Sequence, residues 1–161
     1  MPRVGLISDT HGRLDPRVLC IFADADVVSI VHAGDIGTSP DVLWELEALA
    51  PVTAVLGNCD REIPGFALGG RARVTAAGVR ILAIHDFADL GEIPNDVDVI
   101  VCGHSHRPNV TWHGRVLVVN PGSASQRRRM PGTSVAILEI GASGGLAARI
   151  VALEAGPDDA E

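Results

Sequence analysis

"RVGLISDTHG" (residues 3–12) begins as a short apolar run containing Val and Ile, and it ends in polar residues and glycine. Two further runs of this kind follow, at residues 26–32 and 51–57. Their length and β-branched content are typical of strands that are buried on both faces. Asp15-Pro16 and Ser39-Pro40 lie between the runs, and each pair signals the start of a helix. This alternation predicts right-handed crossovers and a largely parallel sheet.

The second half of the chain is richer in strand signals. Ala77-Gly78 and His113-Gly114 predict the turns of two hairpins. The strands are expected within residues 71–85, 96–104, 109–120, 133–140 and 146–154. We therefore predict an α/β fold in which two sheets pack face to face under covering helices. Residues 1–155 are expected to form a single domain, and residues 156–161 a frayed tail.

The composition is that of an ordinary globular protein. The chain has 161 residues, of which 47% are hydrophobic and 20% are charged. No apolar run approaches the roughly 18 to 20 residues that span a bilayer, and the N-terminus lacks the segment order of a signal peptide. We therefore expect a cytoplasmic protein without a membrane partner. Cys20, Cys59 and Cys102 are widely spaced and predict no disulfide framework.

The charged residues argue against a protein that coats nucleic acid and exclude a P-loop. The formal net charge is −7, which argues against a protein that coats nucleic acid. An anionic substrate stays compatible with this charge, because bound metal ions supply positive charge locally. All 13 basic residues are arginine, so the chain cannot contain the lysine of a P-loop.

Polar side chains that can bind metal ions follow the ends of five predicted strands. They are Asp9, His11, Asp35, Asn58, His85, His104 and His106. The carboxyl ends of strands in α/β sheets form the edge where ligands bind, so we expect these side chains to converge. Two carboxylates, one amide and four imidazoles offer only nitrogen and oxygen atoms. This set suits two divalent first-row ions better than a structural zinc site.

The order of the motifs resembles that of a known family. The motifs are "SDTHG" (8–12), "HAGDIG" (32–37), "GNCD" (57–60), the later His85, and "GHSH" (103–106). Together they resemble the calcineurin-like metallophosphoesterases. The chain length and "NPGS" (120–123) are similar to those of the small YfcE-like phosphodiesterases. The resemblance implies a four-layer α-β-β-α sandwich, in which helices flank two mixed sheets and a dinuclear metal centre lies at the strand ends.

The resemblance also implies a role for each ligand. Asp9, His11 and His106 would hold one ion. Asn58, His85 and His104 would hold the other, and Asp35 would bridge the two. We expect manganese, with nickel, iron or zinc as alternatives. A hydroxide that bridges the ions would attack phosphorus in line, which predicts a phosphodiesterase that hydrolyses a small phosphate ester. Asn58, His85 and Asp60 are assigned to the catalytic group, with Asp60 in a supporting hydrogen bond to a ligand or catalytic histidine.

Two residues depart from the family pattern. Cys59 stands where larger relatives have a histidine that assists the leaving group. We place Cys59 at the substrate and predict a preference for activated esters, such as aryl phosphodiesters. Asp86 follows His85 where relatives have glycine, and it either supports an imidazole or narrows substrate access. Arg127, in a run of three arginines, either contacts the substrate phosphate or lies in a solvated loop.

Several alternative interpretations remain open at this point. His32 is expected in the core or in a supporting role, and His113 at the surface. Cys102-x-His104-x-His106 could form a Cys/His zinc site, but Cys102 ends an apolar strand and is better explained as a small buried hydrophobe. The rival functions are a non-catalytic scaffold, such as the retromer subunit of the same fold, and a nuclease. All seven ligand positions are filled, which favours catalysis. The resemblance also implies a homodimer or homotetramer.

Overall fold

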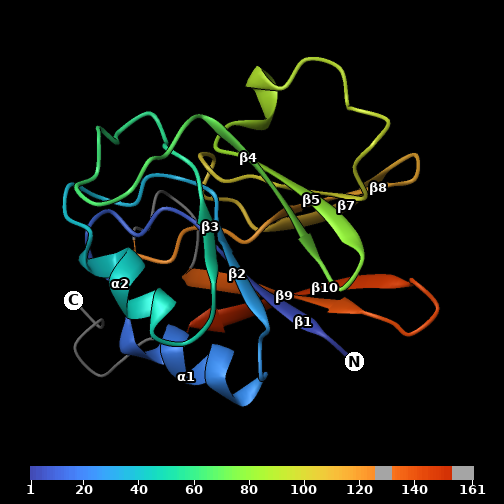
Figure 1. The fold of residues 1–161 in the computed structure, drawn as a ribbon, viewed down its shortest axis with the longest axis horizontal. Helices are drawn as coiled ribbons and strands as arrows, with labels where there is room; N and C mark the ends of the chain where they lie inside the picture. The colour runs from blue at the N-terminus through green and yellow to red at the C-terminus, as the bar shows by residue number, and fades with distance from the viewer. Residues whose placement is uncertain (126–131, 154–161) are drawn as a thin grey trace.

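Two five-stranded β-sheets lie face to face in the computed structural model, which describes residues 1–125 and 132–153 (Figure 1). The first sheet contains, in spatial order, β10 (Leu146–Leu153), β9 (Thr133–Ile140), β1 (Arg3–Ile7), β2 (Ser29–His32) and β3 (Val52–Ala54). The second contains β4 (Arg71–Ala76), β5 (Val79–Ile84), β6 (Val99–Val101), β8 (Val116–Asn120) and β7 (Asn109–His113). Each sheet mixes parallel and antiparallel pairs, so the predicted fold class is confirmed.

The first sheet follows the alternating pattern of the sequence. β1, β2 and β3 are parallel neighbours, joined by α1 (Pro16–Asp24) and α2 (Asp41–Glu47). Asp15 is the N-cap of α1, and its side chain accepts a hydrogen bond from the backbone N–H of Arg17 at 2.9 Å. β9 then pairs antiparallel with β1 and places the end of the described chain in the same sheet.

Helix α2 begins one residue later than its sequence signal predicts. Pro40 occupies the N-cap position, and the Ser39 hydroxyl accepts a hydrogen bond from the N–H of Asp41 at 3.3 Å. Leu49 lies beyond the helix and is 37% exposed. The stripe that packs on the sheet consists of Val42, Leu43 and Leu46.

The second sheet contains both predicted hairpins. The β4–β5 turn lies at Ala77-Gly78, as predicted. The β7–β8 turn lies at Gly114-Arg115, one residue beyond the predicted position. β5, β6 and β8 are parallel neighbours, with β4 and β7 added antiparallel at the two edges.

Apolar side chains fill three spaces between the layers. The first space lies between the two helices and the first sheet, where Phe22 and Ile7 are fully buried. The second lies between the two sheets and contains Leu6 and Leu117. The third lies under residues 87–97, which cover the outer face of the second sheet with a short 3₁₀ helix, η1 (Phe87–Asp89), and a loop. In the described part of the chain, the second outer layer is therefore a loop with one turn of 3₁₀ helix.

The strand arrangement brings distant loops to one edge of the sandwich. β1, β2 and β3 run parallel in one sheet, and β5 and β6 run parallel in the other. Each of these five strands is followed directly by one of the polar motifs. No helix in the described residues is long and apolar enough to cross a membrane.

Candidate metal centre

The backbone around the predicted ligands is unusual. Five of the seven ligands adopt left-handed φ angles: Asp9 (57°), His11 (47°), Asp35 (52°), His104 (68°) and His106 (59°). This conformation costs a residue other than glycine on the order of 1–3 kcal/mol, and such residues cluster at functional sites. The left-handed backbone therefore orients the side chains of the predicted ligands and lowers the stability of the fold.

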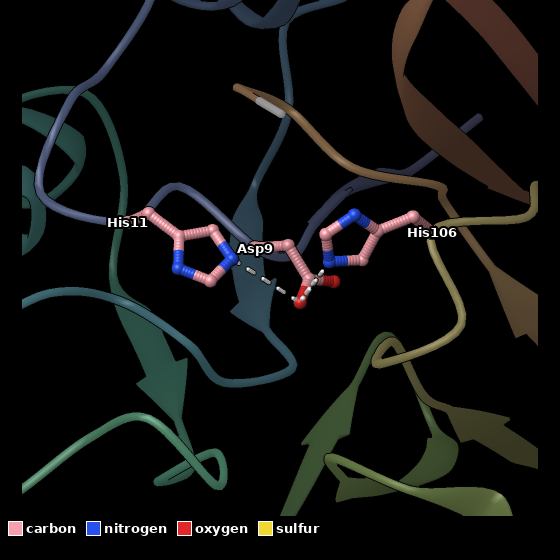
Figure 2. A group of neighbouring side chains, drawn as sticks. All are labelled: Asp9, His11 and His106. Atoms are coloured by element: carbon pink, nitrogen blue, oxygen red, sulfur yellow. Dashed lines mark ion pairs between the residues drawn. The ribbon is translucent and has the colours of Figure 1, made fainter. Parts of the chain in front are cut away.

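The first group of ligands surrounds the buried carboxylate of Asp9. Its Oδ1 lies 3.2 Å from Nε2 of His106 and 3.8 Å from Nε2 of His11, and the two rings flank the carboxylate (Figure 2). Its other oxygen, Oδ2, accepts hydrogen bonds from the Ser8 hydroxyl at 2.7 Å and from the His104 N–H at 3.3 Å. Asp9 Oδ1 and His11 Nε2 are buried and have no hydrogen-bond partner among the described residues.

The second group converges on the side-chain oxygen of Asn58. Asn58 Oδ1 lies 2.9 Å from Nε2 of His85 and 3.1 Å from Nδ1 of His104. Asp35 stands between the two groups, because its Oδ2 lies 3.4 Å from Nε2 of His85 and 3.7 Å from Nε2 of His11. All seven predicted ligands are thus brought together, in the two groups that the resemblance implies.

The protons of His85 show that this arrangement suits a cation. Its Nδ1 lies 2.7 Å from the carbonyl oxygen of Ala33, which can only accept, so Nδ1 carries the proton. In the neutral ring Nε2 is then an acceptor, yet it faces the oxygens of Asn58 and Asp35, which are acceptors too. A positive ion would satisfy all three of these atoms at once. Asp9 Oδ1 and His11 Nε2 also lack a hydrogen-bond partner among the described residues, so the set fits divalent metal ions.

Asp60 supports the ligand loops through the backbone. Its carboxylate accepts hydrogen bonds from the N–H groups of Ile36, Gly37 and Gly57, at 3.0, 3.0 and 2.8 Å. These amides flank Asp35 and Asn58, so Asp60 joins two ligand loops. The predicted hydrogen bond from Asp60 to a histidine is not among these contacts. The three amides occupy the carboxylate, which makes Asp60 a positioning residue.

His32 links the loops that follow β1 and β2 through hydrogen bonds to both. It is fully buried, as expected, and its Nδ1 accepts the N–H of Gly34 at 3.2 Å. Its Nε2 therefore carries the proton and donates to the Thr10 hydroxyl at 3.0 Å, and that hydroxyl donates to the Ile36 carbonyl at 2.8 Å. Burial lowers the pKa of His32 from 6.5 to about 3, and the neighbouring His85 adds to the fall.

Two glycines in the motifs lie so close to neighbouring loops that no side chain would fit at their positions. A Cβ on Gly57 would lie 2.3 Å from the backbone nitrogen of Asp35. A Cβ on Gly103 would lie 1.9 Å from the hydroxyl oxygen of Ser8. Sequence reasoning missed Ser8, Thr10 and Gly57 as members of the site. The glycine signal was present inside "GNCD", but its partner is distant in sequence.

The cysteines near the centre differ in character. Cys59 is exposed, and its backbone N–H donates to Asp35 Oδ1 at 2.9 Å. Cys102 is buried as expected, and burial, with added effects from Asp86 and Asp9, raises the pKa of its thiol to about 12. Because metal binding requires a thiolate, a Cys/His zinc site at Cys102 is disfavoured. Arg127 lies outside the described residues.

A cavity of about 290 Å³ opens beside the second ligand group. It is lined by Asn58, His85 and His104, together with Asp86 and Arg71. The guanidinium of Arg71 donates to the carbonyl oxygens of Asp89 and Leu90, at 2.9 and 3.3 Å.

Comparison with known proteins identifies the family. The model of the calcineurin-like phosphoesterase superfamily domain matches residues 3–143. The chain belongs to the calcineurin-like phosphoesterase superfamily. A relative in this superfamily, a probable metallophosphoesterase of Methanothermobacter thermautotrophicus, is 35% identical over 159 residues, covering 85% of each chain. Phosphodiesterase YfcE of Escherichia coli is 31% identical over 150 residues, covering 78% of this chain and 80% of YfcE.

Solved structures in the superfamily have the same architecture. The structure of YfcE from E. coli matches with a TM-score of 0.69 and 27% identity, over 94% of this chain and 100% of that chain. A single mutant of Vps29 from Entamoeba histolytica matches with a TM-score of 0.72 and 20% identity, over 94% of this chain and 99% of that chain. The likeness to Vps29 is one of fold alone. The sandwich predicted for the calcineurin-like phosphoesterases is thus confirmed.

Proposed function

We propose that this superfamily member is a metal-dependent phosphodiesterase with a centre for two divalent ions. The observation that carries the proposal is the meeting of His85 Nε2 with the oxygens of Asn58 and Asp35, while the ring proton of His85 lies on Nδ1. One ion would be held by Asp9, His11 and His106. The other would be held by Asn58, His85 and His104, with Asp35 shared. Manganese is the expected metal, and nickel, iron or zinc are the alternatives.

The chemistry of such a centre follows from its charge. When bound at this site, two divalent ions would supply a nucleophile at neutral pH and would neutralise the phosphoryl oxygens as charge shifts. The protein's own residues hold the ligand atoms in place beforehand. Asp9 and Asp35 are buried, and the surrounding low dielectric strengthens their attraction for cations. The ester group would lie in the cavity beside Asn58, His85 and His104.

The departure of the leaving group depends on a residue that can donate a hydrogen bond or a proton to it. Cys59 would lie at the substrate where larger relatives have a histidine, and its S–H is a weaker hydrogen-bond donor to a departing oxygen than the N–H of an imidazolium. We therefore expect activated esters to be preferred. The value of kcat/KM for bis-p-nitrophenyl phosphate should exceed that for a dialkyl phosphodiester by on the order of 100-fold or more. Similar values for the two substrates would contradict this preference.

Metal dependence and ligand variants test the proposal directly. Metal-free protein is loaded with Mn²⁺, Ni²⁺, Fe²⁺ or Zn²⁺, the bound metal is measured by mass spectrometry, and hydrolysis of bis-p-nitrophenyl phosphate is followed. We expect two ions per chain. Asp35→Asn should lower kcat/KM by at least about 100-fold. His113→Gln is the matched control, because His113 is an exposed histidine on β7 and should leave both readouts unchanged.

The rival proposal is a non-catalytic interaction scaffold of the same fold. The likeness to Vps29 makes the fold compatible with it, but a scaffold gives no reason for the acceptor atoms that meet at His85 Nε2, or for a buried Asp9 Oδ1 without a hydrogen-bond partner among the described residues. Absence of hydrolysis with every ion tested would favour the scaffold. A nuclease is ranked lower because of the net charge of −7. The homodimer or homotetramer stays a prediction.

A further inference from the structure

We propose that Asp86 accepts the outer ring N–H of His104 and thereby positions this histidine for metal binding. The inference rests on the proposed metal centre and adds a residue to it. Asp86 directly follows His85 at the end of β5, and its Oδ2 lies 3.6 Å from Nε2 of His104.

The two ring nitrogens of His104 face different surroundings. Nδ1 points inward, 3.1 Å from Asn58 Oδ1, and Nε2 points outward to Asp86. Nδ1 can bind an ion only when it carries no proton. The neutral ring then holds its proton on Nε2, where the carboxylate of Asp86 is the facing acceptor. The carboxylate thus favours the one tautomer of His104 that is able to bind metal.

His85 provides a parallel within the same ligand group. Its Nε2 points inward to Asn58 Oδ1, and its outer Nδ1 donates to the Ala33 carbonyl at 2.7 Å. Both histidines of this group therefore have an acceptor behind the ring. Partners of this kind fix the ring and raise the basicity of a metal ligand. Behind His104 the partner is a charged side chain, whereas behind His85 it is the backbone.

Asp86 is itself anchored for this task. Its Oδ1 accepts the N–H of Ala88 at 3.0 Å and caps η1, which leaves Oδ2 for His104. The separation of 3.6 Å exceeds a hydrogen-bond length. A hydrogen bond between them therefore requires a movement of the His104 ring or of Asp86, and both side chains are partly exposed, at 40% and 33%. Metal binding at Nδ1 fixes the proton on Nε2 and favours this closure.

A matched pair of variants tests the inference. Asp86→Asn keeps an oxygen for the cap on Ala88 and removes the charged acceptor for His104. Asp89→Asn removes the same charge from the same 3₁₀ helix, at an exposed residue that lines the same cavity. Titration of metal-free protein with Mn²⁺ should show that Asp86→Asn weakens binding of one of the two ions about tenfold. Asp89→Asn should leave both affinities within about twofold of the wild type.

A spectroscopic readout separates positioning from a general charge effect. In the Zn²⁺-loaded protein, long-range ¹H–¹⁵N correlation spectra should show His104 as the Nε2–H tautomer. The Nε2–H resonance should move on Asp86→Asn and return toward the wild-type position on Asp86→Glu. Equal losses of Mn²⁺ affinity in Asp86→Asn and Asp89→Asn, or an unmoved Nε2–H resonance, would overturn the inference alone. A wild-type protein that binds no Mn²⁺ would overturn the proposed function, and the inference with it.

Discussion

At the scale of single residues, the centre depends on side chains that do not bind metal. Asp60 and His32 each join two ligand loops through hydrogen bonds to the backbone or to a hydroxyl. Such groups would hold the predicted ligands in place whether or not an ion is bound. Their removal should therefore appear first in the stability of the metal-free protein, and only then in metal affinity.

Asp60→Ala should destabilise the metal-free protein. The variant leaves three backbone N–H groups, on Ile36, Gly37 and Gly57, without their charged acceptor. We expect the free energy of unfolding to fall by about 3 kcal/mol or more. Urea denaturation measures it, with Asp24→Ala, an exposed aspartate at the end of α1, as control. Equal effects of the two substitutions would refute the supporting role of Asp60.

His32 should make the stability of the metal-free protein depend on pH. Its pKa is about 3 in the fold and 6.5 when unperturbed, so between these values the unfolded chain binds one proton more than the folded chain. The stabilising effect is complete above pH 6.5 and is lost as the pH falls toward 3, at about 1.4 kcal/mol per pH unit. Asp35, His85 and His11 also act on this ring.

Urea denaturation of wild type and His32→Asn between pH 4 and pH 7, in the presence of a chelator, measures this slope. Asn retains an acceptor for Gly34 and does not titrate, so its curve should be flatter by about 1.4 kcal/mol per pH unit. Parallel curves for the two proteins would show that His32 is not the group responsible.

At the scale of elements, the close packing of α1 on β1 depends on a glycine in the strand that leads to Asp9. Gly5 lies in β1, and a Cβ built there would lie 2.9 Å from the ring of the fully buried Phe22 in α1. The Phe22 ring is fully buried among apolar side chains, so it cannot move away from an added Cβ without displacing its neighbours. The absence of a side chain at Gly5 therefore lets α1 approach the strand that leads to Asp9.

Gly5→Ala should destabilise the fold by about 1–3 kcal/mol, since overpacking shifts Phe22 or the whole of α1. Gly145→Ala is a suitable control, because a Cβ at Gly145 meets no heavy atom within 4 Å and its φ is not left-handed. The free energy of unfolding from urea denaturation compares the two. A Gly5→Ala protein as stable as the Gly145→Ala protein would show that α1 tolerates the added methyl group.

At the scale of the whole molecule, the two sheets are joined by the centre as well as by the core between them. Asp9, Asp35 and Asn58 belong to loops of the first sheet, whereas His85 and His104 follow strands of the second. An ion bound by both sets would tie the sheets together at one edge. Metal binding should therefore stabilise the entire sandwich and not only the loops.

Mn²⁺ should raise the free energy of unfolding by about 2.7 kcal/mol at a free concentration of 100 times its Kd. The reason is that the unfolded chain does not hold the ligands together. Thermal unfolding with and without EDTA measures the effect, and Asp35→Asn should abolish most of it. A Tm that Mn²⁺ leaves unchanged in the wild type would exclude a tightly bound ion.

The sequence patterns predicted the features that depend on local periodicity, namely the strands, the helices and the positions of the strand ends. Strand and helix alternation placed β1 to β3 in one sheet, and strand ends located the seven candidate ligands, although their binding of metal stays a prediction. Residues 87–97 place Phe87, Leu90, Ile93 and Val97 on the second sheet at a spacing that a helix would share, so periodicity alone could not distinguish a helix from the observed loop. Gly91 and Pro94, which disfavour a helix, lie within this segment. The partners of Asp60 and His32 could not be predicted either, because each hydrogen bond joins loops whose approach is set by the finished fold.

The left-handed backbone at the ligands implies a trade-off between function and stability. His11 has a φ of 47°, and its Nε2 has no hydrogen-bond partner among the described residues. Glycine adopts this φ without strain, so His11→Gly should be at least as stable as the wild type in EDTA, and less stable than it in excess Mn²⁺. Urea denaturation under the two conditions would reveal the crossing. Selection for stability alone would then tend to erase the ligands, and only catalysis would retain them.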